Sequence, residues 1–225
     1  TFPNLYQSAH ANVLTNGARF YVDTGGGIHY LEYATPEAAS VRELLALEVE
    51  RDYFLIEFFN RVARLYDKRG IEIVASKDNI GSSNTGTRGF HDNYLIDSQL
   101  FQRIKDADPS IKRTIVPFMI ASIFFSGNGQ VNTSNGHKLS YLFSSRATIM
   151  DKVYSDSTVL GRGIVNLRSE SLMTDPQKSR LHIIFHDSPS LEAGSFLRIG
   201  TFEILLSALE KGYAYSDYLP FSNQA

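Results

Sequence analysis

The sequence has 225 residues, a formal net charge of −2 and no cysteine, which excludes disulfides, thiolate nucleophiles and zinc–thiolate sites. Hydrophobic residues make up 43% of the chain, enough for a sizeable core, while the weak net charge argues against a general nucleic-acid or membrane surface. No apolar run reaches the ~20 residues of a membrane span and no signal peptide is present, so we expect a cytoplasmic protein.

Strands and helices intermix along the chain without regular βαβ spacing. Strands are expected over residues 17–23, 29–33, 71–76, 91–96, 139–143, 164–167 and 180–186. Helices are expected from 36 to about 68, over a short stretch from 98, and over 109–125, 146–154 and 190–211. Between them lie a loose lead-in at 1–11, a turn at 24–27, polar connections at 77–90 and 130–138, and a tail at 213–225. This order predicts an α+β (or α/β) fold, a largely antiparallel sheet with helices on one face, in a single domain over residues 1–225.

The ends of the helices carry the clearest local signals. Thr35 and Pro36 fit the N-cap and the first position of the long helix, and Gly70 fits the residue that ends it. Ser98 is expected to cap the short helix, and Gly212 to stop the last one.

The strand at 17–23 is expected to present polar side chains on one face only. Side chains alternate across a strand, so Arg19, Tyr21 and Asp23 share one face while Phe20 and Val22 share the other. The apolar face would enter a core. The other face would carry a cation, a phenol and a carboxylate in a row, about 7 Å apart.

A second carboxylate, Glu32, follows on the next predicted strand. Asp23 and Glu32 on neighbouring strands of one sheet would form an acidic site suited to a hard cation such as magnesium. The alternative is a strand end that carries ordinary surface acids. Composition and spacing leave both interpretations open.

A loop rich in Gly, Ser and Thr lies at residues 81–89, flanked by Asn79 on one side and by His91 and Asn93 on the other. Such a loop can present main-chain N–H groups to phosphate. It is not a Walker A loop, because no Gly-Lys-Ser/Thr follows. A mobile surface loop is the alternative.

The last predicted strand places two histidines on one face, followed by an aspartate: His182, His186 and Asp187. A neutral imidazole is a common metal ligand, although half-buried structural histidines are also common. Arg146 and Arg168 lie beside strand–turn boundaries, where arginine can bind phosphate or carboxylate in a bidentate manner or lie on the surface. A Ser-His-Asp triad stays open because serine is plentiful, although no Gly-x-Ser-x-Gly elbow occurs.

Taken together, segments spread over residues 12–211 resemble the Pup ligase and Pup deamidase (depupylase) family, part of the glutamine-synthetase-like carboxylate–amine ligase group. Residues 12–23 and 29–37 resemble the family's first strands, and Leu14-Thr15-Asn16 is more similar to the deamidase branch. The other matching segments, in order, are Lys77-Asp78-Asn79, Gly89-Phe90-His91-Asp92-Asn93-Tyr94-Leu95-Ile96, Pro117-Phe118, Gly127-Asn128-Gly129, Ser144-Ser145-Arg146-Ala147, Ile164-Val165-Asn166-Leu167-Arg168, Arg180-Leu181-His182-Ile183-Ile184 with Asp187, and Leu197-Arg198-Ile199-Gly200-Thr201.

The resemblance implies a curved antiparallel sheet that forms a cradle for ATP and magnesium, and it implies roles for single residues. Asp23 would be the catalytic residue, acting as base for an attacking lysine or at an amide carbon, and Glu32 and His182 would belong to the metal shell. The residues expected to contact the nucleotide or the substrate's terminal glutamate are Arg19, Tyr21, Asn79, His91, Asn93, Arg146 and Arg168. The implied partners are Pup or a Pup-like protein and pupylated substrates, with no nucleic acid and no membrane.

The chain also departs from the family pattern. No Gly-x-Glu metal-binding strand precedes residue 12, and Asp92 stands where the family has glutamate, one methylene longer. The family's Thr-Arg-Asp-Glu-Pro-His segment is altered over residues 167–172, and the C-terminal small domain is missing. These differences suggest a fragment of a divergent member or a degenerate paralogue.

Three functions are therefore expected, in this order of preference. The first is an ATP- and magnesium-dependent amide or isopeptide hydrolase of the deamidase/depupylase type, centred on Asp23. The second is a catalytically reduced binding or regulatory module, and the third is a carboxylate–amine ligase of the Pup-ligase type.

Overall fold

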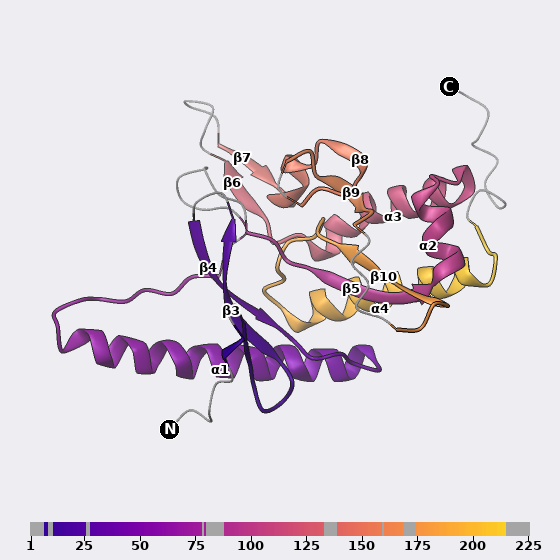
Figure 1. Cartoon of the computed structure of the whole chain (residues 1–225). Coiled ribbons are helices and arrows are strands. Elements are labelled where there is room, and N and C mark those ends of the chain that lie inside the picture. Colours follow the sequence, from indigo (N-terminus) through magenta and orange to yellow (C-terminus); the bar gives the residue numbers. More distant parts are fainter. Residues whose placement is uncertain are drawn as a thin grey trace. The chain divides into compact units, whose positions relative to one another are not determined.

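The computed structural model of the chain describes residues 7–8, 11–25, 28–77, 79, 88–132, 139–158, 160–168 and 174–214. The chain divides into two compact units, Thr1–Lys77 and Asp78–Ala225, which are described one after the other (Figure 1). The single domain expected over residues 1–225 stays a prediction. The central residues of the loop at 77–90, most of the connection at 130–138 and most of the tail lie outside the described residues.

The first unit combines one antiparallel sheet with one long helix. Its elements are β1 (Gln7–Ser8), β2 (Ala11–Val13), β3 (Arg19–Gly25), β4 (Ile28–Ala34) and α1 (Val41–Asp67). The strands lie in the order β1-β2-β3-β4. The strands expected at 17–23 and 29–33 are confirmed. The loose lead-in expected at 1–11 is wrong at residues 7–8 and 11, which pair in β1 and β2, while residues 1–6 and 9–10 lie outside the described part of the chain.

An aromatic cluster joins β3 and β4 to α1. The Phe20 ring lies 5.3 Å from the Phe54 ring and 5.0 Å from the Phe58 ring, centroid to centroid, with Tyr33 of β4 at 6.4 Å. Phe20 is buried, as its strand face predicts, but Val22 on the same face is 54% exposed. The core of this unit is therefore concentrated at the Phe20 end of β3.

Helix α1 begins later than the Thr35-Pro36 signal predicts. Its N-cap is Ser40, whose side chain accepts a hydrogen bond from the Glu43 N–H at 3.2 Å. The Glu43 carboxylate in turn accepts from the Ala39 N–H at 2.7 Å. This reciprocal pair resembles a capping box and fixes the first turn at Val41, so the predicted start at Thr35-Pro36 is wrong. The predicted end near Gly70 is confirmed, with Gly70 at a φ of +69°.

The strand expected over residues 71–76 is also wrong. These residues have no regular secondary structure, and Ile71 and Val74 are exposed. Alternating apolar residues predict a strand only where a partner strand can satisfy the main-chain groups. No strand of the described chain pairs with this segment.

In its described residues, the second unit contains three helices, three small sheets and a 3₁₀ turn. Its elements are β5 (Asp92–Asp97), α2 (Ser98–Lys105), α3 (Pro109–Ser126), β6 (Gln130–Asn132), β7 (Ser140–Leu142), η1 (Arg146–Ile149), β8 (Lys152–Ser155), β9 (Gly163–Asn166), β10 (Lys178–Ile183) and α4 (Glu192–Glu210). The pairs β10-β5 and β6-β7 are antiparallel, and β8-β9 is parallel.

Side chains from α2, α3 and α4 share one hydrophobic core with β5, β9 and β10. Its fully buried centre includes Ile104, Ile115, Met119, Leu181 and Phe202. One face of the β10-β5 pair thus packs on helices, as Figure 1 shows. The predicted α+β class is confirmed: the sheets are antiparallel except for β8-β9.

Two expectations in this unit are corrected. The helix predicted over 146–154 is only the short turn η1, because Lys152–Ser155 pairs with Gly163–Asn166 as a strand instead. The N-cap of α2 is Asp97, since the Ser98 hydroxyl donates to the Pro176 carbonyl at 3.0 Å. Each site bonds to a partner outside its own segment, and these contacts override the local propensities.

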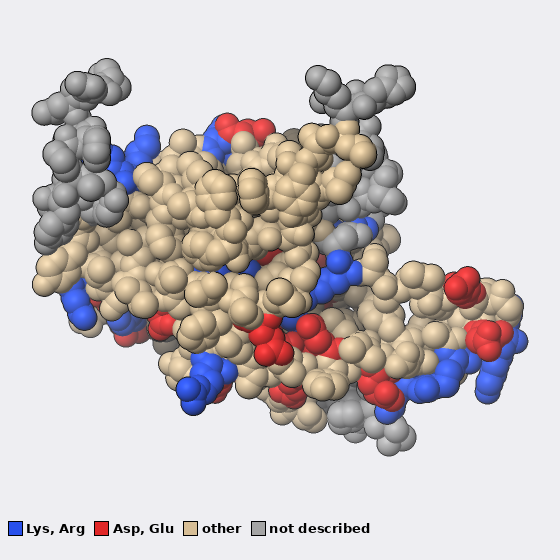
Figure 2. All heavy atoms as spheres, turned by 180° about the vertical axis from the view of Figure 1, so that it is seen from behind, with Lys and Arg blue, Asp and Glu red and all other residues tan. Residues whose placement is uncertain are grey.

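On the face drawn in Figure 2, acidic and basic side chains lie interspersed across a large uncharged area. None of the described helices combines the length and apolarity that a membrane crossing requires.

Candidate functional site

The polar face of β3 and β4 is assembled as the sequence predicts. Tyr21 pairs with Glu32 across the antiparallel register, and Asp23 pairs with Tyr30. Directly opposed residues point to the same face, so Arg19, Tyr21, Asp23 and Glu32 share it. Asp23 and Glu32 are diagonal neighbours on this face, a relation in which Cα atoms lie about 7–8 Å apart.

A phenol–carboxylate hydrogen bond fixes one side of this face. The Tyr21 Oη donates to Glu32 Oε1 at 2.8 Å. Burial raises the pKa of Tyr21, and the hydrogen bond to Glu32 and its negative charge raise that pKa further, while Arg19 opposes them. Tyr21 is therefore a donor at any physiological pH and holds Glu32 as an acceptor. Asp23 is the exposed carboxylate of the pair.

The second unit brings two predicted histidines into contact. His182 Nε2 on β10 lies 3.2 Å from His91 Nδ1, in the residue just before β5, and the two rings are 4.8 Å apart. Asn93 is the direct partner of His182 in the β5-β10 register. These three predicted site residues thus form one cluster at the start of β5.

The surroundings of His182 keep its ring neutral. The side chain is 6% exposed, and its Nδ1 has no hydrogen-bond partner among the described residues. Burial lowers the pKa of His182 to about 3, and the charges of His91, Arg180 and Arg168 add to this effect. A neutral imidazole with a bare nitrogen can accept a hydrogen bond or ligate a metal.

Arg146 is buried and bonded to the main chain. Its Nε and Nη2 donate to the Ile184 carbonyl at 2.9 and 2.7 Å, and its Nη1 donates to the Arg88 carbonyl at 2.6 Å. Burial lowers the pKa of Arg146 to about 10, Arg162 acts in the same direction, and Asp187 opposes them. The guanidinium N–H groups thus donate to main-chain carbonyls. The expected contact of Arg146 with a phosphate or carboxylate stays a prediction.

Asn79 closes the base of the Gly/Ser/Thr loop. Its side-chain Oδ1 accepts from the Ser188 N–H at 2.8 Å, and its carbonyl accepts from the Arg88 N–H at 2.9 Å. Arg88 in turn is held by Arg146. The ends of the loop are thus anchored, while residues 80–87 lie outside the described part of the chain.

Arg168 lies in the wall of a cavity of about 590 Å³ at the carboxyl ends of β8 and β9. Its N–H donates to Asn166 Oδ1 at 2.9 Å, and its Nη1 donates to Thr158 Oγ1 at 3.3 Å. The charged residues of the lining are Lys105, Lys152, Asp156 and Arg168. With three cationic side chains and one carboxylate, the lining has a net positive charge, which suits the cavity to binding an anion.

The predicted site residues fall into two groups, one in each unit. Arg19, Tyr21, Asp23 and Glu32 belong to Thr1–Lys77, and the other six belong to Asp78–Ala225. Within the described residues, no three His, Asp or Glu side chains gather closely enough to hold a metal ion. The metal shell expected from Glu32 and His182 stays a prediction.

The comparison with known families decides the membership of this chain. The profile of the Pup-ligase protein family matches residues 4–223. The chain belongs to the Pup-ligase protein family. The resemblance in the sequence segments is therefore confirmed, and the site residues can be considered within that family.

Relatives in this family carry both ligase and depupylase names. A depupylase of Acidothermus cellulolyticus is 32% identical over 209 residues, covering 92% of this chain and 39% of the relative. A Pup–protein ligase of Jonesia denitrificans is 32% identical over 208 residues, covering 91% and 42%. The Pup–protein ligase of Mycobacterium tuberculosis strain H37Ra is 31% identical over 208 residues, covering 91% and 43%. The chain thus spans about two fifths of the length of these relatives.

Two solved structures share the fold. The Pup ligase PafA in complex with ADP superposes with a TM-score of 0.75 at 24% identity, covering 92% of this chain and 43% of PafA. The complex between Pup and its ligase PafA gives a TM-score of 0.76 at 25% identity, covering 91% and 40%. The glutamine-synthetase-like α+β fold expected from the sequence is confirmed by this likeness.

In this member of the Pup-ligase family, the sequence motifs missed a buried network behind β5. Arg198 of α4 donates from Nη2 to Asp92 Oδ1 at 3.1 Å, and its Nε lies 3.1 Å from Asp92 Oδ2. Arg198 and Asp92 both lie in segments that match the family, yet a matching segment does not say which side chains meet. The alternation in β5 was the available signal: Asp92 must face opposite to His91 and Asn93.

The network also contains a serine and a histidine. Ser122 Oγ lies 2.8 Å from His186 Nε2, and His186 Nδ1 lies 3.5 Å from Asp92 Oδ2. Ser122 and His186 are each 1% exposed, and Asp92 is already engaged by Arg198. A substrate cannot reach these buried side chains. Although they follow the order Ser-His-Asp, they form a structural network of the interior and not a catalytic triad.

Proposed function

We propose that this chain carries the catalytic carboxylate and part of the nucleotide site of a Pup-pathway enzyme. The chemistry is the formation or cleavage of an amide bond at a glutamate side chain, with ATP and magnesium as cofactors. The observation that carries the proposal is the shared face of Arg19, Tyr21, Asp23 and Glu32 in a chain of the Pup-ligase family.

Asp23 is suited to act as the base. It is exposed on a strand, so its position is fixed by the sheet while its carboxylate is reachable. A positioned carboxylate that accepts the proton of an attacking amine, or of water, accelerates such a step by about 10²–10⁴-fold. Arg19 carries a positive charge on the same face, on the far side of Tyr21.

The second unit offers groups suited to a nucleotide. The cavity at Arg168 carries excess positive charge, and His91, Asn93 and His182 add ring and amide groups. A neighbouring fold is that of PafA in complex with ADP, which supports a nucleotide here. When bound, ATP would supply the activation of a carboxylate.

The fit to magnesium differs between its two expected ligands. Glu32 provides oxygen, which magnesium prefers, whereas His182 provides an imidazole nitrogen, which suits transition metals better. The Tyr21 hydrogen bond leaves Glu32 one further oxygen to offer. We therefore assign the magnesium contact to Glu32 first.

The direction of the reaction is assigned to ligation, with hydrolysis as the second candidate. Relatives named Pup–protein ligase recur, which favours ligation. The equally similar depupylase of Acidothermus cellulolyticus favours cleavage of a Pup–lysine bond or deamidation, the hydrolytic function expected from the sequence. In either direction the partners are Pup and its protein substrates, in line with the fold shared with the Pup–PafA complex.

The purified chain is tested for magnesium–ATP binding by calorimetry, for joining Pup to a substrate lysine, and for cleaving that linkage. We expect Asp23→Asn to keep nucleotide binding and to lose at least ~100-fold in rate. The matched control is Asp67→Asn at the exposed end of α1, which should leave the rate unchanged. A wild-type chain that binds no nucleotide and neither joins nor cleaves would overturn the proposal. Binding of Pup with no turnover would instead assign the catalytically reduced module.

A further inference from the structure

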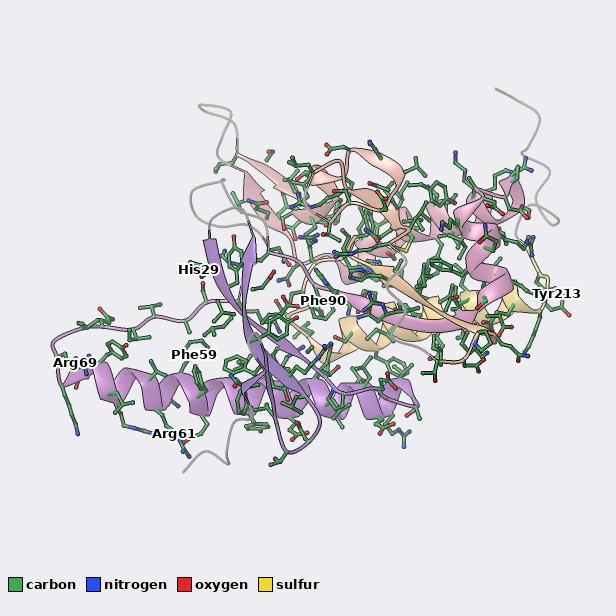
Figure 3. All side chains as sticks on the ribbon, in the orientation of Figure 1. His29, Phe59, Arg61, Arg69, Phe90 and Tyr213 are labelled. Atoms are coloured by element: carbon green, nitrogen blue, oxygen red, sulfur yellow. The ribbon has the colours of Figure 1, made fainter. Side chains whose placement is uncertain are left out.

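Arg198 is the most enclosed cation among the described residues of the second unit. It lies on α4 with none of its surface exposed. Its guanidinium contacts the Asp92 carboxylate through two nitrogens at 3.1 Å and donates from Nη1 to the Asp187 carbonyl at 3.3 Å. Its Cζ lies 4.6 Å from the centre of the Phe90 ring, in the segment that enters β5 (Figure 3). A buried guanidinium with this set of contacts joins three points of the chain.

Those three points surround the histidine pair. Phe90 directly precedes His91 in the chain, and Asp92 directly follows it. The Asp187 carbonyl lies in the segment after β10, the strand that carries His182. Arg198 therefore holds the main chain on both sides of His91 and the continuation of the strand that bears its partner.

The alternation of β5 explains why this contact orients His91. Asp92 is buried toward α4, so its neighbours His91 and Asn93 point the other way, and both are exposed. His91 Nδ1 then reaches His182 Nε2 at 3.2 Å, and Asn93 stands opposite His182 in the register. A slip or rotation of β5 would move both side chains off this face.

The charge balance makes the contact obligatory. Burial alone would raise the pKa of Asp92, but the charge of Arg198 and the neighbouring His186 ring outweigh burial and lower it. Asp92 is thus a buried carboxylate that depends on Arg198 for compensation. The short Asp92 side chain reaches the guanidinium because Arg198 of α4 lies directly against it.

We infer that Arg198 is a positioning residue for the His91–His182–Asn93 cluster, acting through Asp92 and Phe90 from the opposite face of β5. Arg198 acts on the cluster without contacting its rings. The expected effect of Arg198 on nucleotide binding rests on the proposed function. Its effect on the geometry of His91 and His182 does not.

The test separates positioning from mere stability with a charge-matched pair of substitutions. Arg198→Met leaves Asp92 uncompensated, so the melting temperature should fall by about 10 °C. Combining it with Asp92→Asn removes the buried charge and should restore most of that loss. The matched control is Arg103→Met, which removes an ion pair to Asp108 elsewhere in the unit.

The deciding measurement is the NMR spectrum of the imidazole nitrogens and ring protons of the unliganded chain, recorded at one pH. The same experiment tests whether the rings of His91 and His182 lie close to each other. We expect the folded Arg198→Met, Asp92→Asn variant to lose the wild-type shifts and the proximity signal, while Arg103→Met keeps both. If the double variant keeps the wild-type shifts and proximity, the positioning role is overturned. The same variants are titrated with magnesium–ATP, and a loss of about tenfold or more in affinity is expected for the double variant. If the rings move while the affinity stays the same, positioning holds and the proposed nucleotide role of the pair fails.

Discussion

The neutral ring of His182 makes the stability of the chain depend on pH in a defined direction. Its folded pKa is about 3, well below the value of about 6.5 for an unperturbed histidine. The unfolded chain therefore binds a proton that the folded chain rejects between those values. Stability from this residue is fully present above about pH 6.5 and is lost as the pH falls toward 3.

We expect the metal-free chain to lose about 2 kcal/mol through His182 between pH 7 and pH 5, because each unit of pKa shift corresponds to about 1.4 kcal/mol. Urea unfolding at the two pH values measures it. In His182→Gln the difference in unfolding free energy between the two pH values should shrink by that amount. The exposed His29→Gln should keep the wild-type difference. An unchanged pH dependence in His182→Gln would show that its ring is not the acceptor of that proton.

Arg146 illustrates what a sequence leaves open at the scale of one residue. An arginine near a strand end predicts a ligand contact or a surface position, yet this side chain is 2% exposed and donates to two carbonyls. The sequence does give the residue type and its neighbourhood. Burial, and with it the choice of acceptor, depends on segments 38 and 58 residues away in the chain.

Arg146→Lys should therefore act mainly on stability. A lysine keeps the charge but cannot make the forked bonds to the Ile184 and Arg88 carbonyls, so the free energy of unfolding should fall by about 2–3 kcal/mol. Arg168→Lys, in the wall of the cavity, is the comparison and should change stability by less than about 0.5 kcal/mol. Chemical denaturation gives both numbers. If Arg146→Lys keeps its stability but loses nucleotide affinity, the structural role is contradicted and Arg146 contacts the ligand, as expected from the sequence.

Among the elements, those with a strong local period and a partner close at hand were predictable. The expected strand at 91–96 is confirmed as β5, and the helices at 109–125 and 190–211 as α3 and α4. The strand expected at 180–186 is confirmed only as far as Ile183, where β10 ends, and residues 184–186 are not strand. The two wrong assignments have a common cause. Residues 71–76 have no partner strand within the described part of the chain, and residues 152–155 have one that the local pattern does not reveal. The polar face of β3 and β4 was predictable because side-chain alternation needs no long-range information.

The start of α1 gives a direct test of an element boundary. Ser40→Ala removes the acceptor for the Glu43 N–H and should lower stability by about 1 kcal/mol. Thr35→Ala, at the position that the sequence signal favours, should cost far less because Thr35 lies outside the helix. Thermal or urea unfolding of the two variants measures the contrast. Equal losses would mean that Ser40 does not act as the cap in solution.

At the scale of the whole molecule, the sequence predicts one domain, and the contacts divide into two units. Each unit has apolar packing of its own: the ring cluster around Phe20 in the first, and the helix–strand core around Met119 in the second. The loop at residues 81–89, rich in Gly, Ser and Thr, begins just after the boundary at Lys77. Its composition fits a linker as well as a phosphate-binding or surface loop, so composition alone does not reveal the division.

Two core truncations decide whether the units unfold separately. Phe20→Ala should cost about 3–5 kcal/mol and Met119→Ala about 2–5 kcal/mol, since each leaves a cavity in its own core. Amide hydrogen exchange, followed peptide by peptide, reports local opening. If the units are independent, Phe20→Ala speeds exchange in β3, β4 and α1 while β10 and α4 keep wild-type protection, and Met119→Ala does the reverse. If either substitution speeds exchange throughout both units to the same extent, the chain unfolds as the single domain expected from its sequence, because one cooperative core transmits any loss to every element.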